Sequence, residues 1–336
     1  MRFGVIGSGS WATALSKILT DNGHKIHWWV RNPSIIRHLT SRHHNPQYLS
    51  SVNFDPGLLN LTGLVAEVVA DSDCLVVAVP SAYVVSTLDS LDRAAFRGKK
   101  ILSAIKGILP EQNLLLNEWL ASEFALDQDD YFTVMGPCHA EEVAAEKLSY
   151  LTFSGRREAA TRELADCFRT GYLNTVINQD IYGVQFAAIL KNIYALGAGM
   201  AHGLEYGDNF LSVLIANCAD EMAGFLRKLG VHHIEVGVHR TANYAASVYL
   251  GDLLVTCYSL YSRNRTFGNM IGKGYSVKAA QLELNMVAEG YNASKCIHLK
   301  NKKVGAEMPI ADMIYRILWE NVNAALGMKQ IEPYLV

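Results

Sequence analysis

The stretch that most constrains the fold of this chain is its first 22 residues. Residues 2–6 are mainly apolar and predict a strand, and the apolar spacing of residues 12–22 predicts a helix. Between them lies a GxGxxA pattern. Gly7 allows a tight turn, Gly9 allows a pyrophosphate to approach the backbone, and Ala12 permits close packing of helix and strand. We therefore predict a Rossmann-type unit that holds a dinucleotide with its phosphates at the helix N-terminus.

The residue after the second predicted strand bears on the choice of dinucleotide. This strand, residues 25–30, is followed by Arg31. An acidic residue at this point takes the ribose 2′-hydroxyl of NAD, whereas an arginine can accept the 2′-phosphate of NADP. We expect either nicotinamide cofactor, NADP or NAD, with Arg31 favouring NADP. A solvated arginine at a strand end is the alternative interpretation.

Three further apolar runs predict buried strands at residues 74–79, 100–105 and 131–135. Continuous apolar runs separated by helical patterns are typical of a parallel sheet with helices on both faces. Ligands of such sheets bind outside the carboxyl ends of the strands, where Lys106 and the turn 136–140 fall. Lys106 is therefore a candidate for holding an anion, although a surface lysine on a loop would look the same.

The chain changes character near residue 180. Strand-like residues 151–153 and 174–177 flank a polar helical segment, and only helical patterns follow Asp180. A chain of 336 residues is expected to form two domains. We predict that residues 1–180 form an α/β Rossmann-type domain and that residues 181–336 form an all-α domain.

A predicted helix at residues 183–200 is nearly all apolar but carries Lys191 and Asn192 in its middle. The residues three and four positions from Lys191 share its face, and they are three alanines and a tyrosine. Because burial disfavours a charged ammonium, a lysine placed here is expected to have a chemical task in the wall of a cleft. The alternative is a lysine that extends its head to the surface.

Composition and charge narrow the function classes. Hydrophobic residues make up 50% of the chain, 18% are charged, and the net charge is −2. These values are typical of a soluble globular protein and disfavour nucleic acid or an anionic membrane as the main partner. No signal sequence or membrane span is visible, so we expect a cytoplasmic protein. The six scattered cysteines and the histidine pairs at 43–44 and 232–233, expected at the surface, predict no metal site.

Three polar clusters stand out in the predicted helical domain. Asp208 or Asn209 is expected to cap a helix. Asp252 precedes an apolar run and could be a helix cap or the partner of a buried lysine. The segment 262–268 holds two arginines, whose planar guanidinium groups suit phosphate oxygens, although an exposed basic loop would have the same composition.

Taken together and in order, these stretches resemble the NAD(P)-dependent glycerol-3-phosphate dehydrogenase family over nearly the whole chain. The motifs that carry the resemblance are GSGSWATAL at 7–15, AVPS at 78–81, IKGI at 105–108, MGPCHAEEVA at 135–144, LKN at 190–192, GLEYGDN at 203–209, GDLLVTC at 251–257, SRNRTFG at 262–268 and AEG at 288–290. The resemblance implies a Rossmann-type domain followed by an all-helical domain like the C-terminal domain of 6-phosphogluconate dehydrogenase, usually in a homodimer. It also implies interconversion of dihydroxyacetone phosphate and sn-glycerol 3-phosphate, which supplies glycerophospholipid synthesis.

The resemblance also implies roles for individual residues. Lys191 would be the catalytic acid and base. The residues expected to contact the substrate, besides Lys191, are Lys106, Gly136, Cys138, Asn192, Asp252, Thr256, Ser262, Arg263 and Asn264. The residues expected to contact the cofactor are Gly7, Gly9, Ser10, Trp11, Arg31, Lys106, Ala140, Arg263, Val287 and Glu289.

The sequence departs from the family pattern at three places. Cys138 stands where the family usually has serine or threonine, so a side-chain contact with the substrate is in doubt, whereas a backbone N–H contact would persist. Residues 214–217 read LIAN where the family commonly reads LITR, and the interval between Lys191 and Asp252 is stretched around residues 232–240.

Two other functions stay open from the sequence. One is another two-domain NAD(P)-dependent reductase, of the ketopantoate or 3-hydroxyacid type, which would have no use for a phosphate-binding arginine cluster. The other is a non-catalytic regulatory protein that binds NADPH.

Overall fold

The computed structural model describes residues 1–231, 245–284 and 287–336. Two features noted in the sequence, the histidine pair 232–233 and the stretched interval 232–240, lie outside the described residues.

The described chain forms two compact units. Unit 1 comprises Met1–Ile105 and Leu114–Ile181, and unit 2 comprises Lys106–Asn113 and Tyr182–Val336. Lys106 therefore belongs with the helical part of the chain, although β5 of unit 1 (Lys100–Ser103) ends only three residues before it. The division of the protein into domains at residue 180 stays a prediction.

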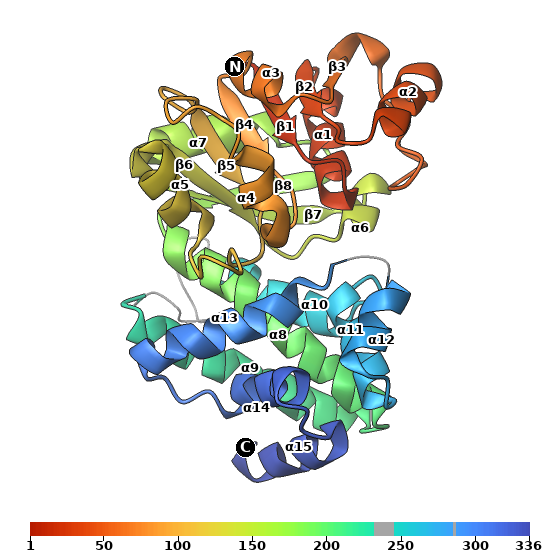
Figure 1. Ribbon diagram of the computed structural model, residues 1–336, viewed down its shortest axis with the longest axis vertical. Helices are drawn as coiled ribbons and strands as arrows, with labels where there is room; N and C mark the ends of the chain where they lie inside the picture. The colour runs from red at the N-terminus through yellow and green to blue at the C-terminus, as the bar shows by residue number, and fades with distance from the viewer. Residues whose placement is uncertain (232–244, 285–286) are drawn as a thin grey trace. The chain divides into compact units, whose positions relative to one another are not determined.

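Unit 1 is built around an eight-stranded sheet with the strand order β3-β2-β1-β4-β5-β6-β7-β8 (Figure 1). In chain order the strands are β1 (Phe3–Ile6), β2 (Ile26–Trp29), β3 (Leu59–Thr62), β4 (Cys74–Val77), β5, β6 (Tyr131–Met135), β7 (Ser149–Gly155) and β8 (Leu173–Asn178). All neighbouring strands pair in parallel except β6 and β7, which are antiparallel.

The predicted parallel sheet is confirmed for β1, β2, β4, β5 and β6. The sequence does not predict β3, because this edge strand is only partly buried and lacks a continuous apolar run. Nor does an apolar run indicate the direction of a strand, so the antiparallel pairing of β7 had no signal in the sequence.

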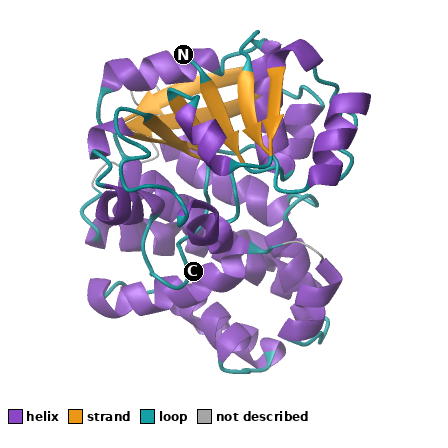
Figure 2. Cartoon of the chain, turned by 45° about the horizontal axis from the view of Figure 1, so that its top comes forward, coloured by secondary structure: helices purple, strands orange, loops and turns teal. Residues whose placement is uncertain are grey.

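Helices cover both faces of the sheet in unit 1 (Figure 2). They are α1 (Ser10–Asp21), α2 (Pro33–Arg42), α3 (Val65–Ala70), α4 (Val84–Leu88), α5 (Leu116–Phe124), α6 (Ala140–Ala144) and α7 (Glu158–Cys167). Phe3 and Val5 belong to the buried cluster that includes the apolar side of α1. Gly4 faces the opposite way, since a Cβ added there would lie 2.8 Å from Val68 of α3. The alternation along β1 thus buries both faces of the sheet.

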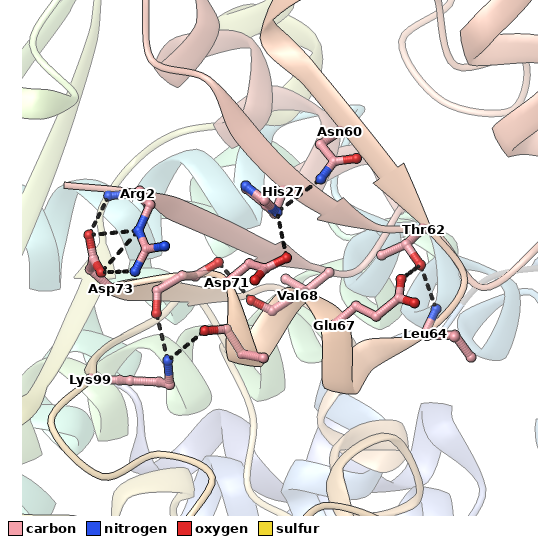
Figure 3. Close-up of polar contacts among 12 residues, drawn as sticks. Arg2, His27, Asn60, Thr62, Leu64, Glu67, Val68, Asp71, Asp73 and Lys99 are labelled. Carbon is pink, nitrogen blue, oxygen red and sulfur yellow. Dashed lines mark hydrogen bonds and ion pairs between the residues drawn. The ribbon is translucent and has the colours of Figure 1, made fainter.

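Polar contacts join the amino ends of three strands in unit 1 (Figure 3). The Arg2 guanidinium, just before β1, lies 2.8 Å from a carboxylate oxygen of Asp73, just before β4. The Lys99 ammonium, just before β5, donates to the carbonyl of Ser72 at 2.8 Å. These contacts occupy the amino edge of the sheet. The carboxyl edge, where Gly7 follows β1, is the edge at which parallel sheets bind ligands.

Every element of unit 2 in the described part of the chain is helical, as the sequence predicts. The helices are α8 (Ile181–Gly203), α9 (Asp208–Lys228), a π-helical segment (Ala245–Gly251), α10 (Asp252–Tyr258), α11 (Arg263–Gly272), α12 (Val277–Leu284), α13 (Glu289–Val304), α14 (Pro309–Trp319), α15 (Ala324–Ile331) and a 3-10 helix (Glu332–Tyr334). None of the helices formed by the described residues is long and apolar enough to cross a lipid bilayer.

The prediction that Asp208 or Asn209 caps α9 is wrong by one or two residues. Gly207, with the extended backbone that a capping residue needs, is the N-cap, and Asp208 is the first helical residue. The carboxylate of Asp208 is still favourable there, because the first turn of a helix carries partial positive charge.

Glycines bring the backbones of α8 and α11 into direct contact. A Cβ added at Gly199 of α8 would overlap the carbonyl oxygen of Arg265, and one added at Gly268 of α11 would overlap the carbonyl oxygen of Leu196. The small residues of the 183–200 stretch therefore serve a close approach of two helices. This approach places the beginning of α11 beside the middle of α8.

We predict that Gly268→Ala destabilises the protein by about 1–3 kcal/mol, because the new methyl group must push α11 away from α8. Gly224→Ala is the matched control, since Gly224 lies inside α9 and an added Cβ there meets nothing within 4 Å. Alanine is the better helix former, so the control should gain roughly 0.5–1 kcal/mol. Urea unfolding measures both changes, and equal behaviour of the two variants would contradict close packing at Gly268.

Candidate functional site

The turn between β1 and α1 has the geometry that the GxGxxA pattern predicts. Gly7 has a φ of +128°, and a Cβ there would lie 2.7 Å from the carbonyl oxygen of Ala78. Gly9 is the N-cap of α1, and an added Cβ would meet nothing within 4 Å. Ser10 and Trp11 form the start of the helix. A helix N-terminus approached through an open glycine fits the pyrophosphate of a dinucleotide.

Arg31 lies where the sequence predicts, just after β2. Its side chain is exposed, and Asn32 next to it caps α2 by accepting a hydrogen bond from the Ser34 N–H at 2.9 Å. The capping bond fixes the start of α2 immediately after Arg31. A guanidinium at this end of the second strand is where the 2′-phosphate of NADP is held in Rossmann units.

The 136–140 turn of unit 1 engages both hydrogen-bond donors of Cys138 within the protein. The thiol donates to the carbonyl of Tyr150 at 3.1 Å, and the N–H of Cys138 donates to the carbonyl of Gly136 at 2.8 Å. Gly136 has a φ of +132°, and a Cβ there would lie 2.8 Å from the same Tyr150 oxygen. Ala140 begins α6. The hydrogen bonds of Cys138 therefore stabilise the conformation of the turn. A contact between Cys138 and a substrate stays a prediction.

In unit 2, Lys191 is buried and forms an ion pair. Only 4% of Lys191 is exposed, so its head does not reach solvent along the surface. Its ammonium donates a hydrogen bond to the carboxylate of Asp252, the first residue of α10. The ammonium of Lys106 lies 3.9 Å from the other oxygen of the same carboxylate. Asp252 is thus the partner of the buried lysine, and two cations share one buried anion.

This environment brings the pKa of Lys191 down to about 8. Burial is the largest cause, the negative charge of Asp252 opposes it, and the positive charge of Lys106 adds to the lowering. A group with a pKa near working pH can both give and take a proton.

Two asparagines link this ion cluster to the neighbouring helices of unit 2. The N–H of Gly290, in α13, donates to the side-chain oxygen of Asn264 at 2.9 Å. The Asn264 amide donates to the side-chain oxygen of Asn192 at 3.0 Å, and the Asn192 amide donates to the carbonyl of Lys106 at 2.9 Å. A backbone N–H can only donate and a backbone carbonyl can only accept, so the two ends of the series fix the orientation of both amides. The series holds the Lys106 backbone against α8.

The remaining predicted site residues of unit 2 lie on α10, α11 and α13. The hydroxyl of Thr256 donates to the carbonyl of Asp252 at 2.6 Å. Ser262 caps α11 by accepting from the Arg265 N–H at 3.3 Å, and Arg263 is the first helical residue. Two predicted cofactor contacts lie at the start of α13, where Glu289 is its first residue and Val287 precedes it.

The sequence analysis did not single out Glu221, a buried acid of α9. Its carboxylate accepts hydrogen bonds from the N–H groups of Ile310 and Ala311 at 2.8 and 2.9 Å, which caps α14. It also accepts one from the hydroxyl of Tyr194 at 3.1 Å, one turn beyond Lys191 on α8. Burial raises the pKa of Glu221 to about 7. The available signal was its place among the apolar residues of α9, where an acid needs partners.

Unit 1 has a sheet of this strand order with a glycine turn after β1, and unit 2 is helical with a buried lysine. These features are typical of the class of two-domain NAD(P)-dependent oxidoreductases. Two family models place the chain within that class. The model for the N-terminus of NAD-dependent glycerol-3-phosphate dehydrogenase matches residues 2–161, and the model for its C-terminus matches residues 180–329. The chain belongs to the NAD-dependent glycerol-3-phosphate dehydrogenase family, which confirms the resemblance seen in the sequence.

Individual relatives agree with this assignment. A glycerol-3-phosphate dehydrogenase [NAD(P)+] of Bacillus anthracis is 32% identical over 326 residues, which cover 96% of this chain and 93% of the relative. The crystal structure of glycerol-3-phosphate dehydrogenase from Coxiella burnetii matches with a TM-score of 0.87 at 25% identity, covering 98% of both chains. A ketopantoate reductase from Ralstonia eutropha reaches a TM-score of only 0.59 at 14% identity, with 98% of this chain and 100% of that chain covered. The last likeness concerns the fold alone.

Glu221 leads to a prediction about stability and pH. Its folded pKa of about 7 lies above the ordinary value of 4.5, so the folded state holds the proton more tightly. The resulting stabilisation is complete below about pH 4.5 and is lost as the pH rises through 7. We predict that the unfolding free energy of the wild type, relative to Glu221→Gln, falls by about 3 kcal/mol over this range, since a pKa unit corresponds to roughly 1.4 kcal/mol. Urea unfolding of both proteins at pH 5 and pH 8 measures the change, and parallel pH profiles would contradict it.

Proposed function

We propose that this protein interconverts dihydroxyacetone phosphate and sn-glycerol 3-phosphate with a nicotinamide dinucleotide. The observation that carries the proposal is the ion cluster of buried Lys191 and Asp252 with partly exposed Lys106. The chain is also 32% identical over 96% of its length to a glycerol-3-phosphate dehydrogenase [NAD(P)+]. A buried lysine of this kind has little structural value, because burying charges costs free energy that an apolar core would not. A chemical task accounts for it.

In the proposed reaction Lys191 is the acid and the base. In reduction its ammonium polarises the ketone and gives its proton to the carbonyl oxygen; in oxidation the neutral amine takes the proton from the hydroxyl group. Asp252 orients the amine and stabilises its charged form, whereas Lys106 adds the positive charge that suits a phosphorylated, anionic substrate. A bound nicotinamide dinucleotide would supply the hydride to the carbonyl carbon in reduction and accept it from that carbon in oxidation.

The cofactor residues of unit 1 favour NADP without excluding NAD. The glycine turn at Gly7 and Gly9 fits the pyrophosphate, which both dinucleotides share. Arg31, exposed after β2, would bind the additional 2′-phosphate of NADP. The name of the Bacillus relative includes both dinucleotides.

Arg263 is the proposed clamp for the substrate phosphate. Its place at the first position of α11 combines a planar guanidinium with the partial positive charge of a helix N-terminus. Asn264 next to it is bonded to Asn192, so the start of α11 is held beside the helix that carries Lys191. Binding energy at the phosphate can then fix the ketone for proton transfer.

We further propose that the enzyme works in the cytoplasm, as a source of glycerol 3-phosphate for glycerophospholipid synthesis, and that it forms a homodimer. Several large apolar side chains on α9, α10 and the following turn are exposed, including Leu260 at 83%; the others are Val213, Leu254, Tyr258 and Tyr261. Exposed apolar side chains on these segments, of which α9 and α10 are in contact, support association with a second copy. Sedimentation of the purified protein tests the dimer.

The decisive assay follows NADPH and NADH absorbance with dihydroxyacetone phosphate and with unphosphorylated dihydroxyacetone. Only the phosphorylated ketone should be reduced at low concentration. Reduction of ketopantoate or a 3-oxoacid in its place would favour the alternative reductase, and NADPH binding without oxidation by any ketone would favour a regulatory protein.

We predict that Lys191→Met folds and binds dinucleotide but loses turnover by about a hundredfold or more, the range of general acid and base groups. The control is Lys302→Met, on the exposed surface of α13, which should retain activity. Near-normal turnover of Lys191→Met would remove Lys191 from the reaction.

In the wild type, we predict that kcat/KM for reduction falls as the pH rises through about 8, because reduction needs the protonated amine. For oxidation, kcat/KM should fall as the pH decreases through about 8, because oxidation needs the neutral amine; both changes follow the pKa of Lys191.

We predict that Arg263→Lys, which keeps the charge but loses the planar fork, raises KM for dihydroxyacetone phosphate about tenfold or more. Arg316→Lys on α14 is the control and should leave KM unchanged, since the guanidinium of Arg316 forms its ion pair with Glu320, four residues along the chain, at 3.6 Å. An unchanged KM in Arg263→Lys would contradict the clamp.

A further inference from the structure

The three carbonyl groups of the glycine turn in unit 1 are each held by a buried side chain. The indole N–H of Trp28, in β2, donates to the carbonyl of Gly7 at 2.6 Å. The amide of Asn45, in the loop after α2, donates to the carbonyl of Ser8 at 3.1 Å. The Thr13 hydroxyl, in α1, donates to the carbonyl of Gly9 at 2.9 Å. Three different elements therefore hold three consecutive residues.

Asn45 also joins two of these contacts to each other. Its amide donates a second hydrogen bond to the hydroxyl of Thr13 at 3.0 Å. Its side-chain oxygen accepts from the N–H groups of Gln47 and Tyr48 at 3.0 and 3.3 Å. Both ends of the Asn45 amide are thus engaged, which fixes its orientation and the distance between its loop and the turn.

None of the three side chains can reach a ligand, because Thr13, Trp28 and Asn45 are all 0% exposed. Their effect passes through the backbone. A peptide group is planar and trans, so its N–H points away from its C=O. Fixing the carbonyls of Gly7, Ser8 and Gly9 therefore also fixes the direction of the N–H groups of Ser8, Gly9 and Ser10.

We propose that Trp28, Asn45 and Thr13 are positioning residues of the dinucleotide site, which orient the turn's N–H groups toward the pyrophosphate before it binds. The open space at Gly9 and the N-terminus of α1 lie on this same turn, so the groups that the three residues align are those that Rossmann units use to hold phosphate. A preformed site spares the ordering of the turn on binding, which appears as affinity. The inference rests on the proposed function for its ligand, and the experiment separates the two.

The experiment measures the dissociation constants of NADPH and of ADP-ribose, which shares the pyrophosphate, for the substrate-free protein. Thr13→Val removes one hydroxyl with little change in volume, and Trp28→Phe removes the indole donor. Each should weaken both ligands about fivefold, equivalent to about 1 kcal/mol, the net value of one hydrogen bond. The double variant should weaken them further, whereas kcat at saturating dinucleotide should stay within about twofold of the wild type. Thr13→Ser, which restores the hydroxyl, should recover the affinity.

Two controls match the changes in unit 1. Thr20→Val removes another buried threonine hydroxyl of α1, which donates to the carbonyl of Ser16 at 3.0 Å, far along the helix from the turn. Trp119→Phe reduces a buried tryptophan of α5 by the same volume. Both should bind NADPH and ADP-ribose as the wild type does. Thermal unfolding of every variant establishes that it is folded.

The outcomes are distinct. Affinities of Thr13→Val and Trp28→Phe within twofold of the wild type, or equal losses in the controls, would overturn the positioning role. If Trp28→Phe does not fold, Thr13→Val and Thr13→Ser still decide the question. Failure of the wild type itself to bind NADPH or NADH would instead overturn the proposed function.

Discussion

The arrangement of unit 2 depends on the interaction of the Asp252 carboxylate with two lysine side chains. The carboxylate is buried, bonded to the Lys191 ammonium, and 3.9 Å from the Lys106 ammonium. Without it, the ammonium groups of Lys191 and Lys106 would face each other with no carboxylate between them, and removal of one partner of a buried pair such as Lys191–Asp252 costs about 3–5 kcal/mol. Burial and the positive charge of Lys106 together outweigh the attraction of Asp252 and leave the pKa of Lys191 near 8, where both protonation states are accessible.

Close backbone packing makes that charge arrangement geometrically possible. Gly199 and Gly268 let α8 and α11 touch, and Gly290 lets the start of α13 approach the backbone of Asn192. The Asn264–Asn192 series then converts this proximity into fixed hydrogen bonds that end on the Lys106 carbonyl. Small residues determine how near the helices come, and the amides determine their register. The Lys191 amine is therefore held among closely packed helices, which provide the fixed geometry that the proposed proton transfer requires.

In both units, buried side chains hold backbone carbonyl groups in place. In unit 1, buried Trp28, Asn45 and Thr13 hold the carbonyls of the glycine turn, and in unit 2, Asn192 holds the carbonyl of Lys106. In each unit, side chains act on backbone groups of a segment with a proposed role in binding or catalysis. Buried polar groups that are fully bonded specify one arrangement, because any alternative would leave a donor or acceptor unsatisfied away from water.

The sequence by itself determined the features of the protein that depend on local periodicity and composition. It predicted the strand, turn and helix at the N-terminus, most of the strands in the sheet, the helical second part and the burial of Lys191, because apolar spacing records which face of an element is covered. It also predicted the family through the order of its motifs. The roles of individual site residues stay predictions.

Only the tertiary structure decided which distant groups meet. It selected Asp252 as the partner of Lys191, 61 positions away, over its other interpretation as a cap. The tertiary structure also placed Lys106 in the helical unit and paired β7 antiparallel to β6. It gave the hydrogen-bond donors of Cys138 acceptors within the protein. No sequence motif indicated the buried contacts of Glu221 and Asn45. Hydrogen bonds and ion pairs depend on distances of a few ångströms between elements, and those distances are set by packing, which local patterns do not contain.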